Sequence, residues 1–328
     1  MPSSVLDQLT SPACRVAYGS AVSEANCHGS PPWLGVALES LAGADSEIIL
    51  PRADEISMRE GFCVFRRGEL AGGFAAASPA QDLESATRDL YRRLFKATRG
   101  MHLYRIWNYV PQINAAEDEL ENYRLFCRGR SLTFEEEFGQ SFQQFLPAAS
   151  AVGTTAGPLA VAFLGGVCAP RYFENPLQLP AFRYPLTCGP RPPSFSRATV
   201  VRTDSGVLVC ISGTAAIRGH ATVAPGDLEA QVACTFENLR SIGKACGVGA
   251  ALGGNGEWQR TFKVYLRRRE DLWRVTKRVE GDLLRPGDQV LYLRADICRS
   301  DLVFEIEARL ASAEIHQDHG RHRLPLRP

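Results

Sequence analysis

The sequence predicts an α+β protein with two related halves, each a mixed β-sheet with helices on one face. Its 328 residues exceed the usual size of one domain. The second half alternates strand and helix patterns regularly, and the first half does so more loosely. A proline-rich segment, 190–198 (PRPPSFSRA), is typical of a stiff connector between them. We therefore expect an N-terminal half over 1–190, with an extra N-terminal segment, and a C-terminal half over 191–328.

The second half contains the clearest patterns. β-Branched runs at 198–203 and 207–212 predict two strands, and Asp204-Ser205-Gly206 between them predicts a hairpin turn. A helix is predicted from residue 228 to about 245, with Asp227 as its cap and Gly247 just past its end. A ββαβαββ order is completed by strand 261–267, helix 270–284 and strands 289–296 and 302–309.

The first half repeats this alternation with weaker signals. Apolar patterns predict both strands and helices, and Pro-rich connections follow from residue 170 to 193. The predicted strands cover 61–66, 70–76, 102–109 and 159–165, and the predicted helices cover 81–98, 117–128 and 133–145.

The composition is that of an ordinary globular protein. Lys and Arg number 37 against 36 Asp and Glu, so the net charge of +1 gives no field that would attract nucleic acid or an anionic membrane. No stretch approaches the roughly 18 apolar residues of a membrane span, and the start of the chain lacks a signal-peptide pattern. We expect a cytoplasmic protein that binds neither nucleic acid nor membrane.

Neither a metal site nor a cofactor is expected. The ten cysteines include no CxxC pair and show no zinc-finger spacing. This pattern favours a chain whose cysteines are reduced thiols. Three of the six histidines, His316, His319 and His322, lie in a polar tail that we interpret as solvated. The glycine-rich segment 247–257 does not lie between a strand and a helix as a phosphate loop does, and is predicted to be a loop.

Several residues of the second half follow a family pattern. Gly213, Gly226-Asp227, Gln231, Thr235, Asn238 and Gly247 occur in order around the first predicted helix, and IEAR follows in the last strand. Together they resemble the Rid superfamily of small enamine and imine hydrolases, whose fold is normally met as a trimer.

Longer blocks carry a narrower resemblance. They are HLYRIWNYVPQIN (102–114), ENYRLFCRGR (121–130), LPAASAVGT (146–154), ENP (174–176), FRYP (182–185), GPRPPSFSRA (189–198) and ADICRSDLVFEIE (295–307). In this order they resemble the chorismatases, which include 3-hydroxybenzoate synthases. The resemblance implies two Rid-like halves in one chain, with an active site between them and chorismate as substrate. It implies a monomer, with a Rid-type trimer as the alternative.

Glu305 is the candidate catalytic acid. Releasing pyruvate from the enol-ether arm of chorismate requires a proton on the terminal methylene carbon. A carboxylic acid can supply that proton near neutral pH if burial keeps it protonated. Alternation in LVFEIEA puts Glu305 and Glu307 on one face of the strand. Glutamates on a strand usually face solvent, but the family motif favours Glu305 as the acid and leaves Glu307 as the competing choice.

Arginine side chains, whose guanidinium groups can form two parallel hydrogen bonds, are expected to bind the two substrate carboxylates. Tyr123 and Arg130 lie seven residues apart, so a helix would place both on one side, and Tyr184 and Arg197 flank the proline-rich connector. These four are assigned to substrate binding. Two neighbours that could exchange roles with them are Arg124 and Arg183.

Cys298 is the candidate product-determining residue. A lone intracellular cysteine is more often a core residue, but the chorismatase resemblance places Cys298 beside the substrate ring. There a cysteine is typical of hydroxybenzoate formation and an alanine of hydrolysis. A second such region holds Ala215 or Ala216, and the sequence does not fix which one aligns.

The preferred hypothesis is pyruvate release from chorismate to give 3-hydroxybenzoate, alone or with 4-hydroxybenzoate. Hydrolysis to 3,4-dihydroxycyclohexa-1,5-diene carboxylate is the alternative within the family. An imine hydrolase of Rid type and a non-catalytic ligand-binding protein are alternatives outside it.

Overall fold

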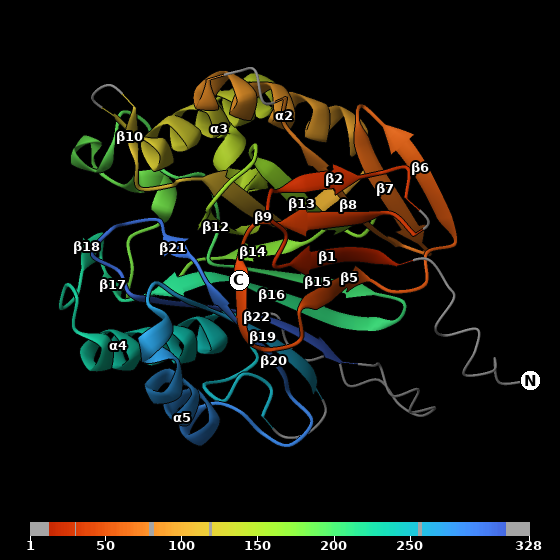
Figure 1. Cartoon of the computed structure of the whole chain (residues 1–328). Helices are drawn as coiled ribbons and strands as arrows, with labels where there is room; N and C mark the ends of the chain where they lie inside the picture. Colours follow the sequence, from red (N-terminus) through yellow and green to blue (C-terminus); the bar gives the residue numbers. More distant parts are fainter. Residues whose placement is uncertain (1–12, 30, 79–81, 118–119, 255–257, 313–328) are drawn as a thin grey trace, which may run out of the picture.

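Two seven-stranded β-sheets pack face to face, and helices cover their outer faces (Figure 1). The computed structural model describes residues 13–29, 31–78, 82–117, 120–254 and 258–312. Apolar side chains from both sheets meet in the middle layer, among them Tyr104, Trp107, Cys210 and Tyr265. The chain is therefore an α+β protein with four layers, helix, sheet, sheet and helix, and the predicted fold class is confirmed.

The N-terminal sheet has the strand order β21-β12-β9-β13-β8-β7-β6. Helices α2 (Leu83–Ala97) and α3 (Asn122–Phe138) cover its outer face through a core rich in aromatic rings. The strands are β6 (Glu55–Arg59), β7 (Phe62–Arg67), β8 (Leu70–Ala76), β9 (His102–Pro111), β12 (Ala148–Thr154), β13 (Ala160–Gly166) and β21 (Asp296–Ile297).

The C-terminal sheet has the order β14-β15-β16-β22-β19-β20-β4. Helices α4 (Leu228–Ala245) and α5 (Leu272–Asp282) pack on its outer face, and the Asp227 side chain caps α4 as expected. The strands are β4 (Glu39–Gly43), β14 (Arg171–Phe173), β15 (Ala198–Thr203), β16 (Gly206–Ala215), β19 (Trp258–Leu266), β20 (Gln289–Arg294) and β22 (Phe304–Ser312). The predicted ββαβαββ order is present.

Three short strands belong to the sheet of the opposite half. β4 and β14 precede residue 190 and pair with β20 and β15, whereas β21 follows residue 190 and pairs with β12. The two sheets are therefore joined at their edges as well as through their facing surfaces.

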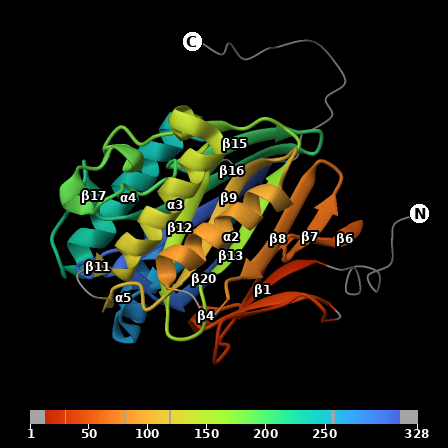
Figure 2. The same ribbon diagram turned by 90° about the horizontal axis from the view of Figure 1, so that it is seen from above.

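Further short elements surround the two sheets. A four-stranded sheet of order β2-β3-β1-β5 lies beside β7 and β8 (Figure 2). Its strands are β1 (Cys14–Tyr18), β2 (Glu24–Asn26), β3 (Trp33–Val36) and β5 (Ser46–Leu50). Two ribbons are formed by β10 (Ala116–Glu117) with β11 (Leu120–Glu121) and by β17 (Ile217–Arg218) with β18 (Ala221–Thr222). Short 3₁₀ helices cover Gly139–Phe145, Ala181–Arg183, Leu186–Cys188 and Arg269–Asp271.

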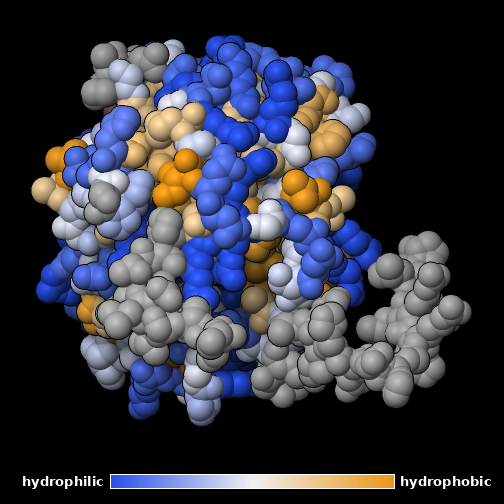
Figure 3. All heavy atoms as spheres, turned by 90° about the vertical axis from the view of Figure 1, so that its right-hand side faces the viewer, coloured by the Kyte–Doolittle hydropathy of each residue, from blue (hydrophilic) through white to orange (hydrophobic). Residues whose placement is uncertain are grey.

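The side of the molecule near β6 is mostly hydrophilic. Among the described residues visible in Figure 3, hydrophobic side chains gather in small separate areas and not in one continuous patch. Ile56 and Met58 of β6 are exposed, and isolated apolar residues at a surface are common in proteins.

Some predicted elements were wrong. Instead of helices at 117–128 and 133–145, one helix, α3, runs through Phe138 and tightens into a 3₁₀ helix at Gly139–Phe145. Strand β12 was not predicted, because AASAVGT is fully enclosed and built of small residues that lack the alternation of a half-exposed strand. The tail histidines lie outside the described residues, as does part of the predicted loop 247–257.

Candidate active site

A cavity of about 420 Å³ opens between the two halves, a size that suits a small organic ligand. Its wall comes from α3, β12, the proline-rich connector, β16 and the segment that links β21 to β22. Eight residues predicted to form the site line it: Tyr123, Arg124, Arg130, Tyr184, Arg197, Ala215, Cys298 and Glu305. Two predicted residues are not among its lining residues: Arg183, which is exposed, and Ala216, which is buried.

Glu305 projects from β22 toward the cavity and is only 4% exposed. Opposite it, β16 bulges between Ile211 and Thr214. A Cβ atom on Gly213 within this bulge would lie 2.1 Å from Glu305 Oε1, so the missing side chain makes room for the carboxyl group. Glu305 Oε1 has no hydrogen-bond partner among the described residues. The general tendency of strand glutamates to face solvent does not hold here, since both Glu305 and Glu307 are buried.

The two glutamates have opposite protonation states near neutral pH. Burial, reinforced by the negative charge of Glu307, raises the pKa of Glu305 to about 8. Burial opposes ionisation of Glu307 as well, but Arg105 and Lys263 outweigh it and lower the pKa of Glu307 to about 2. A pair of carboxyls with pKa values this far apart supplies one proton donor and one fixed negative charge.

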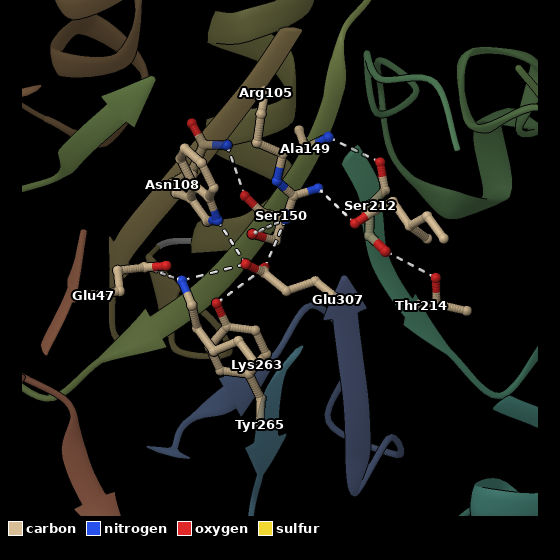
Figure 4. A network of polar contacts seen from close by, with 12 residues as sticks. Glu47, Arg105, Asn108, Ala149, Ser150, Ser212, Thr214, Lys263, Tyr265 and Glu307 are labelled. Carbon is tan, nitrogen blue, oxygen red and sulfur yellow. Dashed lines mark hydrogen bonds and ion pairs between the residues drawn. The ribbon is translucent and has the colours of Figure 1, made fainter. Parts of the chain in front are cut away.

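Glu307 is the centre of a buried polar network (Figure 4). Arg105 Nη2 donates to Glu307 Oε2 over 2.6 Å, and the Tyr265 hydroxyl donates to the same oxygen over 3.1 Å. Trp107 Nε1 donates to Oε1 over 2.6 Å, and Lys263 Nζ lies 3.2 Å from that oxygen. These four donors hold Glu307 as a carboxylate, and Glu307 is not among the residues that line the cavity.

Arg130 supplies a buried cation without a carboxylate partner in the described part of the chain. It is 3% exposed, and its guanidinium lies 5.3 Å from the centre of the Tyr91 ring and 5.5 Å from that of Phe134. Its Nε and Nη2 atoms have no hydrogen-bond partner among the described residues. Because buried charged donors rarely remain unpaired, these atoms indicate a site for an anionic group of a ligand.

Arg197 supplies a second cation from the end of the connector. It is 6% exposed, and its Nη2 donates to the Tyr184 hydroxyl over 2.9 Å. Its Nε lies 4.0 Å from Glu174, a carboxyl whose pKa burial raises to about 7. Nε itself lacks a hydrogen-bond partner among the described residues, so Arg197 retains a free donor beside the cavity.

The remaining predicted residues surround these two arginines. Tyr123 and Arg124 lie in the first turn of α3, and Arg124 is 3.6 Å from Glu121. Arg183 instead lies over the Phe182 ring, 5.9 Å from its centre. Cys298 lines the cavity, and burial raises the pKa of its thiol to about 12, which keeps the sulfur protonated and weakly nucleophilic.

Arg299 and Cys127 are among the lining residues that the sequence analysis did not propose for the site. Arg299 donates to Thr222 Oγ1 over 3.1 Å and to the His220 carbonyl over 2.8 Å, which fastens the β17–β18 ribbon at the cavity. Cys127 lies four residues after Tyr123, and this helical spacing could have indicated that it shares the lining face of α3.

The described residues hold no group of three or more His, Cys, Asp or Glu side chains placed to bind a metal ion. None of the helices in the ranges given above is long and apolar enough to cross a bilayer.

Comparisons with known proteins agree with this geometry. A family model described as "Chorismatase FkbO/Hyg5-like, N-terminal" matches residues 51–165. A 3-hydroxybenzoate synthase of Streptomyces hygroscopicus is 36% identical over 264 residues, which is 76% of this chain and 76% of that protein. A chorismatase of the same organism is 37% identical over 283 residues, covering 82% of this chain and 76% of that protein.

The crystal structure of a chorismatase superposes with a TM-score of 0.81 at 31% sequence identity, covering 95% of this chain and 96% of that one. The fold and the cavity define a two-sheet α+β protein with a buried carboxylic acid facing two buried guanidinium groups. The chain belongs to the chorismatase family.

Proposed function

We propose that this protein releases pyruvate from chorismate and forms 3-hydroxybenzoate, with Glu305 as the proton donor. The observation that carries the proposal is the Glu305 carboxyl. It is buried at the cavity wall with a pKa of about 8, so it is protonated at neutral pH. A protonated carboxyl beside two buried cations suits the protonation of a dicarboxylate enol ether.

In this mechanism the Glu305 proton is transferred to the terminal methylene carbon of the enolpyruvyl arm. The arm becomes an oxocarbenium-like group and the bond from the ring to the ether oxygen weakens. The neighbouring ring hydroxyl then displaces the arm, which leaves as pyruvate, and the hydroxyl proton is released. The strained product opens and aromatises to 3-hydroxybenzoate, so that one chorismate gives one hydroxybenzoate and one pyruvate.

Arg130 and Arg197 are proposed to bind the substrate carboxylates. Both are buried at the cavity, and Nε and Nη2 of Arg130 and Nε of Arg197 have no hydrogen-bond partner among the described residues. Planar guanidinium groups can hold carboxylates through two parallel hydrogen bonds, which fixes orientation as well as charge. Tyr184, which accepts a hydrogen bond from Arg197, and Tyr123 are assigned to the same task, with Arg124 beside them.

Cys298 is proposed to favour 3-hydroxybenzoate over the diene diol. The diol requires water to attack the protonated arm, whereas hydroxybenzoate requires the ring hydroxyl to attack first. A protonated thiol in the cavity wall fills space with a weakly polar group that holds a water molecule poorly. Ala215 lines the same cavity and is proposed as the second product-determining residue.

Incubation of the purified protein with chorismate tests the proposal. We expect stoichiometric pyruvate and 3-hydroxybenzoate by chromatography, and near-complete loss of both in Glu305→Gln, since a general acid contributes about 10²–10⁴-fold. Pyruvate with the diene diol would place the protein in the hydrolysing branch. Absence of turnover, with imine hydrolysis or with chorismate binding alone, would refute the proposal.

We further propose that the protein acts as a monomer in the cytoplasm. Residues of one chain line the cavity from both halves, so no second copy is needed to complete it. All ten cysteines are free thiols, as expected in a reducing compartment. If the protein is a monomer, sedimentation at micromolar concentration gives one species of 35.9 kDa. A trimer in this experiment would refute the proposal that it acts as a monomer.

A further inference from the structure

The network around Glu307 contains four charged side chains that balance one another. Arg105 pairs with Glu307, and Lys263 pairs with both Glu307 and Glu47. Each of the four side chains is at most 7% exposed, so none of them is neutralised by bulk solvent. Two cations and two anions therefore form a closed set behind the cavity wall, connecting β9, β19, β22 and β5.

Glu305 lies next to this set but outside it. It is two residues from Glu307 on the same strand, and its side chain is directed toward the cavity. No salt bridge joins Glu305 to a cation within the described ranges, since Arg105 and Lys263 are already engaged by Glu307 and Glu47. If Glu305 lost its proton, its charge would be a buried, uncompensated anion beside the anion of Glu307.

We propose that the four-charge network, through the ionised Glu307, keeps Glu305 in its protonated and proton-donating form. Glu307 is thus a positioning residue for the acid, acting by charge and without touching substrate. This inference rests on the proposed role of Glu305. It assigns a function to a buried salt bridge that would otherwise bring two charges into the interior for little net stability.

Other ionisable groups also surround Glu305 and have to be separated from this effect. Arg105 of the network and Arg197 in the cavity lining both favour ionisation of Glu305 and oppose the effect of Glu307. Glu174, 4.0 Å from Arg197, is another carboxyl whose pKa, about 7, lies near neutrality. The further groups on the elements around the cavity are Glu121 at the start of α3, Tyr123, Arg124, Cys127 and Arg130 of α3, Tyr184 and Cys188 before the connector, Tyr265 of β19, and Cys298, Arg299 and Asp301 before β22.

The pH dependence of kcat/KM tests the inference, because an acid that must be protonated stops working above its own pKa. Glu307→Gln removes the negative charge nearest to Glu305 and keeps the side-chain shape. Charges two residues apart on a strand lie about 7 Å apart, which predicts a shift of the alkaline limb by about one to two pH units toward lower pH. At pH 9 kcat/KM falls at least about tenfold, while at pH 6 it stays within about twofold of wild type.

Two more variants make the test depend on the sign of the charge. Glu47→Gln removes a negative charge farther away and shifts the limb in the same direction by less. Lys263→Gln removes a positive charge and shifts it toward higher pH. Glu174→Gln checks that the wild-type limb belongs to Glu305, because the limb persists when that carboxyl is absent. Melting curves show which variants remain folded. The test needs one folded variant that has lost a negative charge and one that has lost a positive charge.

A limb that stays in place in all folded variants, or that moves in the same direction for Glu47→Gln and Lys263→Gln, overturns the inference. A uniform loss of kcat/KM at every pH shows a purely structural role and also overturns it. Failure of the proposed function is a separate result, because then the wild-type protein releases no pyruvate or Glu305→Gln remains active.

Discussion

Gly213→Ala tests whether the space in the β16 bulge sets the position of the catalytic acid. A Cβ atom there would lie 2.1 Å from Glu305 Oε1 and 2.8 Å from its carboxyl carbon, whereas ordinary contacts begin near 3.4 Å. The carboxyl group must therefore move by about 1 Å, and a misplacement of that size costs about 10²-fold in rate. This loss corresponds to about 2.7 kcal/mol in activation free energy.

Steady-state kinetics of pyruvate release measures the effect. We expect kcat to fall about 100-fold and KM to change little, since the three atoms nearest to the new methyl group belong to Glu305 and Ser150 and not to the two arginines proposed to bind substrate. Gly281→Ala in α5 is the matched control, because a Cβ there meets nothing within 4 Å and the position is far from the cavity lining. If Gly213→Ala kept more than half of the wild-type kcat in a folded protein, the carboxyl would not depend on this space.

Three further predictions follow from the site. Arg130→Lys and Arg197→Lys are each expected to raise KM for chorismate, because an ammonium group cannot form the two parallel hydrogen bonds that a guanidinium group forms with a carboxylate. The control Arg183→Lys changes an exposed arginine outside the cavity lining and leaves KM unchanged. Equal KM values in all three variants would remove Arg130 and Arg197 from substrate binding. Cys298→Ala is expected to shift product from hydroxybenzoate toward the diene diol with pyruvate release maintained, and an identical chromatographic profile would contradict this. Glu305→Gln is expected to raise the melting temperature at pH 8 by several degrees and to leave it nearly unchanged at pH 4. The folded state holds Glu305 protonated up to about pH 8 while the unfolded chain ionises it near pH 4, so wild-type stability falls as pH rises between these values; no difference at pH 8 would contradict a raised pKa.

The sequence predicted regular elements better than it predicted pairing between distant segments. Helix α4 matches its predicted bounds because it has a cap, an apolar face and a stop close together in the chain. The edge strands β4 and β21 are five and two residues long, and nothing local marks them as partners of the opposite sheet. Their partners are fixed by packing between sheets, which a single sequence does not show.

The same limit applies to the site. Residues carried by family motifs, such as Glu305 and Arg130, could be named in advance, and the cavity brings them together. The burial of Glu307 was not predicted, because its partner Arg105 is 202 residues away in the chain. Alternation along a strand shows which side chains share a face but not whether that face meets solvent or a second sheet.

The pairing of β4 with β20 has a consequence for how the chain folds during synthesis. Residues Glu39–Gly43 emerge from the ribosome early, but their partner strand, Gln289–Arg294, is among the last to be made. The early strand therefore presents an unpaired edge while most of the chain is still being translated, which exposes it to association with other chains. A polypeptide ending near residue 190 would keep β4 and β14 without their sheet, and one beginning there would keep β21 without β12. Each fragment would therefore lack strands that the other fragment carries and that complete its sheet.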